Sequence, residues 1–477
     1  MSHIVQTDRL VDEQKIGAFN IKLLVLSWLA MFADGYDISA MAFAAPELLR
    51  DWHLPAGGLL KYVFAAPNFG VLFGAPLLGY VGDRYGRRVA IIIGSVIFGA
   101  FTLAMMWTTS LEQMMVLRFL TGIGIGGLMP NTIALNSELS PRRWRGMLVV
   151  LMFTGISLGS GTPGPVAGWL VPEYGWRILF LIGGVVPLIA AAVLFFVLPE
   201  SVKFLARLPG RRAELLKVAR SMRPDLELPD DTQFVTETAQ PAAAASPSGG
   251  GFLGLGYIFR GGLAFITPLL WVCFATTLMA NYFLNNWMPL IFESNGVTPK
   301  QAAIASTLYH VGGTIGGIVV SLLLNRFGYA AITLLFLLAA PAIAAVGLNG
   351  LSPGLLAGVA GLAGLAVLGA QFGNNACAGM IYPTEARSQG AGWALAIGRI
   401  GSIIGPIVGG MLIAMKMPPN ELFFWASLPM TVGLFAAILV AWLCYRRFRA
   451  FTLDDKAAEP AESGGVSPAR YTASSSP

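Results

Sequence analysis

The chain has 477 residues, of which 55% are hydrophobic and 12% are charged. Soluble domains carry about 25% charged residues, so this composition excludes an ordinary soluble protein and indicates an integral membrane protein. The formal net charge of +6 does not indicate nucleic-acid binding, because the basic residues lie between apolar segments, as they do in the loops of membrane proteins. Residues 1–19 are polar with charges of both signs, unlike a secretory signal peptide.

Six apolar segments long enough to cross a bilayer are predicted in the first half of the chain. A helix rises about 1.5 Å per residue, so roughly 20 residues span the hydrocarbon layer. The segments are 20–45, 60–82, 89–109, 112–136, 146–171 and 176–198. We expect an N-terminal six-helix bundle over 20–198, preceded by a cytoplasmic segment at 1–19.

Asp34 and Asp37 are the only charges between Leu23 and Ala45, in the first of these segments. A charge at that depth costs about 2.5–3.5 kcal/mol, so such residues usually line a pathway or a binding cavity. Residues three apart share one helix face. Arg118 falls at the depth of Asp37, and a buried arginine needs an anionic partner. The sequence predicts a proton-coupling group of Asp34, Asp37 and Arg118, with Asp37 as an ion-paired gate or relay and Asp34 as the proton site.

The stretch GYVGDRYGRR at 79–88 follows the second segment. We expect Gly79 and Gly82 to permit close helix approach, and the charged residues to form a network at the cytoplasmic face. Charged residues at the matching ends of other segments join the predicted gate. The predicted gating set is Asp83, Arg84, Arg87, Arg88, Glu138, Glu385 and Arg387.

A polar stretch at 199–261 separates the two halves. It contains a basic amphipathic part and the low-complexity run AQPAAAASPSGGG at 239–251, which predicts a partly disordered cytoplasmic linker. The second six segments, which form the predicted C-terminal bundle over 262–445, are 262–291, 300–324, 329–349, 353–378, 388–414 and 421–445. Residues 446–477 are expected to be a disordered tail. The excess of Lys and Arg in one set of loops predicts that both termini are cytoplasmic.

Arg399 and His310 fall near the membrane midplane in the second half, where they could meet an anion. Arginine suits a carboxylate because its planar group donates two hydrogen bonds at once. Aromatic and amide side chains, Phe283 among them, are further candidates for the cavity. The predicted substrate-binding set is Arg399, His310, Tyr36, Tyr282, Asn285 and Trp393. Interhelical contacts that only hold the bundle together are an alternative for each of these residues, and also for Asp34, Asp37 and Arg118.

Two parallel six-helix repeats around a central cavity describe the major facilitator architecture. ADGYD at 33–37, RFLTGIGIGGLMPN at 118–131, YGWR at 174–177, LPES at 198–201 and the stretch 382–410 together resemble the aromatic acid:proton symporter family, which includes bacterial carriers of 4-hydroxybenzoate, protocatechuate and benzoate. The resemblance implies an all-α integral membrane fold with twelve transmembrane helices in two six-helix bundles. It also implies proton-coupled uptake of a small aromatic carboxylate by a monomer in the bacterial inner membrane.

Two other functions stay open at this point. The Gly-Pro stretch at 159–168 is similar to a motif of some antiporters, so efflux of aromatic compounds is one alternative, and a membrane sensor of aromatic acids is another. An enzyme is not expected, because the three histidines are scattered and no Ser-His-Asp or metal-ligand pattern occurs. Three cysteines in apolar stretches do not suggest a disulfide framework or a zinc site. We expect no cofactor and no metal, with protons as the coupling ion.

Overall fold

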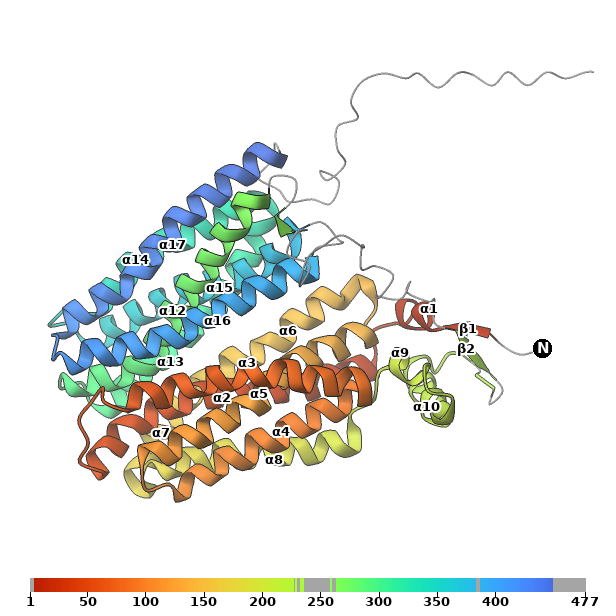
Figure 1. The fold of residues 1–477 in the computed structure, drawn as a ribbon, viewed down its shortest axis with the longest axis horizontal. Coiled ribbons are helices and arrows are strands. Elements are labelled where there is room, and N and C mark those ends of the chain that lie inside the picture. The colour runs from red at the N-terminus through yellow and green to blue at the C-terminus, as the bar shows by residue number, and fades with distance from the viewer. Residues whose placement is uncertain are drawn as a thin grey trace, which may run out of the picture.

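The computed structural model describes residues 4–226, 228–229, 232–235, 258–259, 263–382 and 387–448. The first bundle contains α2 (Ala18–Asp51), α3 (Leu60–Tyr85), α4 (Arg87–Ala104), α5 (Leu111–Leu139), α6 (Arg142–Gly161), α7 (Pro163–Tyr174) and α8 (Arg177–Val197). The second contains α12 (Leu263–Ser294), α13 (Pro299–Phe327), α14 (Tyr329–Val346), α15 (Pro353–Ile381), α16 (Arg387–Ala414) and α17 (Pro419–Phe448). Figure 1 shows the first bundle, red to yellow, beside the second, green to blue.

The predicted fold class is confirmed, with α6 and α7 together making the fifth span of the first bundle. They are separated only at Thr162, where Pro163 lacks the N–H that would continue the helix ladder. Within the described residues, eleven spans are long and apolar enough to cross a membrane, and α6 and α7 count as one of them. The remaining long helix, α5, is more polar because it carries Arg118, Asn131, Asn136 and Glu138.

Small residues bring the helices of the first bundle into close contact. A Cβ on Gly70 of α3 would lie 2.1 Å from the carbonyl oxygen of Phe119, and one on Gly122 of α5 would lie 2.1 Å from that of Pro67. Only glycine allows the two backbones to approach so closely. The glycine-rich run at 121–127 therefore serves helix packing, and it fixes α5 against α3 at the depth of the cavity described below.

A small module lies at one end of the first bundle, which we call the linker end (Figure 1). It comprises β1 (Ile4–Gln6), α1 (Thr7–Asp12), α9 (Val202–Leu205), α10 (Arg212–Met222) and β2 (Gln233–Val235). The two strands pair in parallel, and Leu10 and Val11 join a buried apolar cluster with Leu215 and Met222. Part of the predicted linker is thus helical and packed. The run 239–251 and the tail from 449 onward lie outside the described residues.

Contacts between the two bundles gather toward the opposite end, which we call the distal end and which carries the loops 52–59, 295–298 and 415–418. Phe64 and Trp287 meet edge to face with ring centroids 4.8 Å apart. The Thr307 hydroxyl donates to the Gly161 carbonyl at 3.1 Å. A Cβ on Gly57 would lie 2.7 Å from the Gly410 carbonyl. These contacts close the space between the bundles on the distal side.

Candidate functional site

A cavity of about 150 Å³ lies between the bundles, where α2, α3, α5 and α6 face α12, α13, α15 and α16. Polar and charged side chains predicted from the sequence gather in it. Those that line the cavity are Asp34, Asp37, Arg118, Tyr282, Asn285, His310 and Arg399. Because these residues come from five helices of both halves, only the packing of the bundles against each other brings them together.

Asp37 and Arg118 form a buried ion pair between α2 and α5. Arg118 Nη1 lies 2.7 Å from Asp37 Oδ2. The Arg118 side chain is 2% exposed and the Asp37 side chain is 1% exposed. The Thr102 hydroxyl donates to the other carboxylate oxygen at 3.2 Å, so both oxygens of Asp37 have partners. The sequence predicted this pair, because Arg118 and Asp37 fall at the same depth in the membrane. A buried carboxylate with a charged and a neutral donor is well compensated.

Asp34 lies one turn from this pair and is in a different state. Its side chain is 3% exposed, and its Oδ1 is buried with no hydrogen-bond partner among the described residues. The adjacent Gly35 explains how the aspartate reaches this position, because a Cβ there would lie 2.1 Å from the Ile156 carbonyl oxygen of α6. The Ser160 hydroxyl donates to the Gly35 carbonyl at 2.9 Å. The backbone around Asp34 is therefore packed tightly against α6, while the Oδ1 atom of its carboxylate lacks a hydrogen-bond donor among the described residues.

Arg399 faces the same cavity from α16 and is half-buried. Its Nη1 lies 3.5 Å from the Tyr282 hydroxyl of α12, and none of the ion pairs formed by described residues involves it. Arg118, by contrast, is neutralised by Asp37. Of the two guanidinium groups in the cavity, that of Arg399 therefore lies outside the ion pairs of the described residues, contacts Tyr282 and interacts electrostatically with Asp34.

His310 lies in a hydrogen-bonded cluster that joins the two bundles. The Ser39 hydroxyl donates to Asn285 Oδ1 at 2.9 Å and lies 3.4 Å from His310 Nε2, with donor and acceptor roles set by the tautomer. Asn285 Nδ2 donates to the Ile38 carbonyl at 3.0 Å. Ser39 was not predicted as a site residue. The only indication in the sequence is that it lies in the same segment as Asp34 and Asp37. His310 and Asn285 line the cavity, but their contacts also close it on the distal side.

Three predicted aromatic residues do not reach the cavity, and these predictions are wrong. The Tyr36 hydroxyl donates to the Leu179 carbonyl at 3.3 Å, because two positions after Asp34 a helix presents its opposite face. The Trp393 ring packs 6.2 Å from that of Trp271, and Phe283 packs against Phe423. The aromatic residues that do line the cavity are Tyr282, Phe64, Phe153 and Phe372. The last three were missed because a phenylalanine in an apolar helix looks the same whether it faces lipid, core or cavity.

The charged loop after α3 forms a network within the first bundle. Arg87 Nη2 lies 2.6 Å from Asp83 Oδ1, and Arg87 Nε lies 3.7 Å from Glu138 Oε1 at the end of α5. Arg88 turns away toward the linker module, where its Nη1 lies 3.8 Å from Glu214. Arg84 lies over the Tyr85 ring instead of joining the network. Glu385 and the side chain of Arg387 lie outside the described residues.

Glu200, in the LPES motif, connects this loop to the linker module. Its Oε1 accepts from the backbone N–H groups of Ser201 at 2.9 Å and Arg88 at 3.4 Å. Burial raises the pKa of Glu200, and these hydrogen bonds oppose the shift. Gly86, with φ of +112°, leaves room for the carboxylate, because a Cβ there would lie 2.1 Å from Glu200 Oε2. The loop conformation therefore depends on a glycine and a buried glutamate together.

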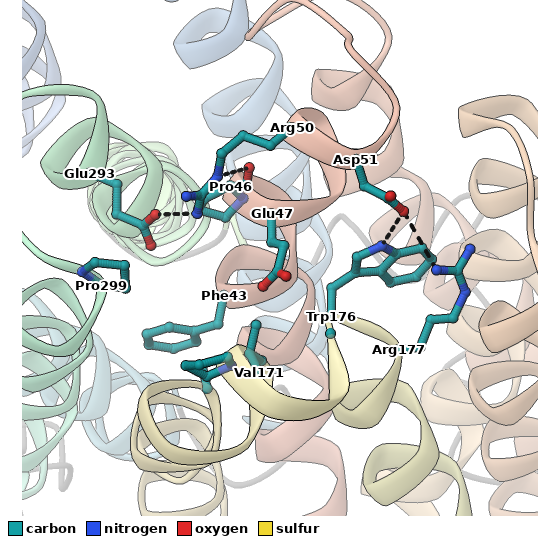
Figure 2. Close-up of a pocket in the computed structure, with 13 residues that line it drawn as sticks. Phe43, Pro46, Glu47, Arg50, Asp51, Val171, Trp176, Arg177, Glu293 and Pro299 are labelled. Atoms are coloured by element: carbon teal, nitrogen blue, oxygen red, sulfur yellow. Dashed lines mark hydrogen bonds and ion pairs between the residues drawn. The ribbon is translucent and has the colours of Figure 1, made fainter.

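A second cavity, of about 510 Å³, opens at the distal end (Figure 2). Arg50 Nη2 of α2 lies 3.0 Å from Glu293 Oε2 of α12, which joins the two bundles. Asp51 Oδ2 accepts from Trp176 Nε1 at 3.1 Å and lies 3.5 Å from Arg177 Nη1. Both arginines thus face carboxylates. Both arginines that line this cavity, Arg50 and Arg177, are therefore already paired.

The sequence matches the major facilitator superfamily over residues 27–294 and 270–473. The chain belongs to this superfamily. It is 33% identical over 430 residues to the 4-hydroxybenzoate transporter PcaK of Pseudomonas aeruginosa, covering 90% of this chain and 94% of the relative. The benzoate transport protein of Acinetobacter baylyi is 31% identical, with 92% and 93% covered. The gallate transporter of Pseudomonas putida is 33% identical, with 88% and 91% covered.

Solved structures of low sequence identity share the fold. The xylose transporter XylE from E. coli, in a partially occluded inward open conformation, aligns with a TM-score of 0.65 at 16% identity, covering 89% of this chain and 97% of that one. A bacterial homolog of the human lysosomal transporter Spinster aligns with a TM-score of 0.64, also at 16% identity, with 91% and 97% covered. The protein is a multi-pass membrane transporter and not an enzyme.

Proposed function

We propose that the protein is a secondary active transporter that takes up a small aromatic carboxylate, such as a hydroxybenzoate, together with protons by alternating access. The observation that carries the proposal is that one central cavity holds both Arg399, which lies outside the ion pairs of the described residues, and Asp34, whose Oδ1 has no hydrogen-bond partner among them. The two side chains interact electrostatically. Relatives named for transport of 4-hydroxybenzoate, benzoate and gallate support the substrate class.

Arg399 would bind the substrate carboxylate through two hydrogen bonds, which a planar guanidinium donates in a fixed geometry. Tyr282 lies against this guanidinium and would hold it in place. Phe64, Phe153 and Phe372 line the same cavity and offer apolar faces to the ring, which favour offset-stacked or edge-to-face contact. A cavity with one arginine outside the described ion pairs and several aromatic rings matches a small aromatic anion.

Asp34 would be the proton site. When ionised it repels an incoming anion, and when protonated it does not, so substrate and proton enter together. Co-transport of at least one proton also has an electrical reason, because moving one negative charge inward against 100 mV costs about 2.3 kcal/mol. Asp37 would act as an ion-paired gate or relay, since Arg118 already compensates its charge.

The linker end would face the cytoplasm, with both termini inside a bacterial inner membrane. Basic residues concentrate at that end, as the positive-inside rule requires. They include Arg84, Arg87, Arg88, Arg143, Arg145, Lys203, Arg207, Arg211 and Arg212. With the distal contacts closed, the arrangement would then be inward-facing, and we expect the transporter to work as a monomer. The network of Asp83, Arg87 and Glu138 would act at the cytoplasmic gate, as would Glu385 and Arg387.

Uptake into proteoliposomes tests the proposal directly. With an inside-alkaline pH gradient, labelled 4-hydroxybenzoate should accumulate above its outside concentration, and a protonophore should abolish this accumulation. Accumulation that ignores the protonophore would refute proton coupling. If intact cells instead hold less labelled acid when they express the protein than when they do not, the direction of transport is efflux.

Replacing Asp34 by Asn tests the proton site separately. Asparagine mimics the protonated aspartate permanently, so we expect exchange of labelled for unlabelled substrate to continue while gradient-driven accumulation disappears. The matched control is Asp225→Asn, at an exposed residue of the linker module that pairs with Arg223, which should accumulate substrate like the wild type. Wild-type accumulation in Asp34→Asn would remove Asp34 from the coupling mechanism.

A further inference from the structure

Asn286 of α12 carries a hydrogen-bond donor that nothing in the described structure uses. Its side chain is 3% exposed, and its Nδ2 is buried with no partner among the described residues. The residue lines the central cavity together with Asp34 and Arg399. Buried amide groups are nearly always hydrogen-bonded, so an unsatisfied one in a binding cavity calls for a partner that arrives from outside the protein.

Two other asparagines on the same helix show that this state is particular to Asn286. Asn281 Nδ2 donates to Gln371 at 3.1 Å, and its Oδ1 accepts from the Tyr309 hydroxyl at 2.9 Å. Asn285 is bonded to Ser39 and to the backbone of Ile38. All three asparagines line the same cavity. The first two hold the helices together, whereas the donor of the third remains available.

The position of Asn286 relative to Tyr282, the residue that contacts Arg399, limits what the missing partner can be. Tyr282, whose hydroxyl touches Arg399, lies four residues earlier on α12 and therefore shares a helix face with Asn286. Tyr282 and Asn286 are separated by about 6 Å along the helix axis. This spacing is close to the distance across a benzene ring from a carboxylate to an oxygen at the para position.

We propose that Asn286 is a specificity-determining residue, which donates a hydrogen bond to the para hydroxyl of an aromatic carboxylate bound at Arg399. The inference rests on the proposed function and adds to it a preference among substrates. Benzoate would leave the Asn286 amide unsatisfied, and a site built to bind a substrate hydroxyl discriminates against the analogue that lacks it. A hydroxyl at the ortho position lies beside the carboxylate and does not reach Asn286.

The test uses proteoliposomes that take up labelled benzoate, with unlabelled 4-hydroxybenzoate and 2-hydroxybenzoate as competitors. For the wild type, half-inhibition should need less 4-hydroxybenzoate than 2-hydroxybenzoate. In Asn286→Leu the half-inhibiting concentration of 4-hydroxybenzoate should rise about threefold to tenfold, the worth of one hydrogen bond, while that of 2-hydroxybenzoate stays unchanged. Asn286→Ala is measured as a second variant, because the leucine side chain could disturb the local packing and alanine adds no bulk.

The control is Asn281→Leu, a change of the same residue type on the same helix and cavity wall. Because Asn281 is satisfied within the protein, this variant should weaken both competitors to the same extent. Equal shifts for both competitors in the two Asn286 variants, or a wild type without preference for 4-hydroxybenzoate, would overturn the role of Asn286 and leave the proposed function intact. A wild type that takes up no aromatic acid would overturn both.

Discussion

Asp34 and Asp37 have the same side chain, stand three residues apart on one helix face, and differ in what surrounds them. Asp37 has a partner for each carboxylate oxygen, Arg118 and Thr102. Asp34 Oδ1 has none among the described residues. Removing a charge from water is costly unless an opposite charge and hydrogen bonds compensate it, and only Asp37 has both. This difference divides the two proposed roles.

The buried pair makes a prediction about stability. Asp37→Asn leaves the Arg118 charge buried without a counter-ion, which should cost about 3–5 kcal/mol and lower the thermal unfolding midpoint of the purified protein. Adding Arg118→Met should recover much of this loss, because neither charge then remains. The control is Asp83→Asn, whose ion pair with Arg87 involves a carboxylate that is 68% exposed and should be worth at most about 1 kcal/mol. Equal midpoints for the two single variants would contradict the prediction.

The packing of α2 against α6 determines where the aspartates lie. Gly35 stands between Asp34 and Tyr36, and its missing side chain lets the α6 backbone at Ile156 come within reach. In the charged motif after α3, Gly82 has a similar part, since a Cβ there would meet Asn131. Gly79 has none, because nothing described lies within 4 Å of its Cβ position, so the expectation of close approach is wrong at that residue. A motif glycine thus shows its purpose only when its neighbours are known.

Gly35→Ala should therefore move α2 away from α6 and displace Asp34. The added Cβ would lie 2.1 Å from a carbonyl oxygen of the facing backbone, and backbone has little room to yield. We expect accumulation of aromatic acid in proteoliposomes to fall at least tenfold and the unfolding midpoint to drop. Gly79→Ala adds the same methyl group where space is open and should behave like the wild type. Similar behaviour of both variants would show that the α2–α6 contact is not limiting.

At the scale of the whole molecule, the two bundles touch in their distal halves. One contact at the distal end is the ion pair between Arg50 of α2 and Glu293 of α12 (Figure 2). Deeper contacts, such as that of Ser39 with Asn285, close the space above the central cavity. The proposed alternating access would require the bundles to separate on this side, so these contacts would have to break once in every transport cycle.

A cross-link at the Arg50–Glu293 position should therefore stop transport. In a background without Cys273, Cys377 and Cys444, Arg50→Cys and Glu293→Cys are joined by a short, cleavable thiol reagent. We expect uptake to disappear after treatment and to return after cleavage, because the joined helices hold the distal side shut. Each single cysteine variant, treated in the same way, is the control and should retain its uptake. Uptake at an unchanged rate in the cross-linked protein would show that the distal side does not open there.

The class of protein, its helices and much of the candidate site could be predicted from the order of the amino acids. Long apolar segments are a local property, because only a helix satisfies its own backbone in a bilayer. Buried charges are so costly there that each one is noticed, which is why Asp34, Asp37, Arg118 and Arg399 could be named from the chain alone. The ion pair of Asp37 with Arg118 also followed, since depth along a helix can be counted from its ends.

The faces on which the helices meet could not be predicted in this way, because they depend on the packing of segments that are far apart in the chain. Tyr36 and Trp393 turned away from the cavity and Phe372 turned into it, because rotation about a helix axis depends on neighbours that periodicity does not identify in uniformly apolar segments. The same holds for the asparagines of α12. Asn281 and Asn286 are the same residue type on the same helix. They differ because only Asn281 has hydrogen-bond partners on other helices. A buried amide without a hydrogen-bond partner costs free energy. An amide that is bonded within the protein therefore has a structural role, whereas we propose that one without a partner, such as Asn286, binds a ligand.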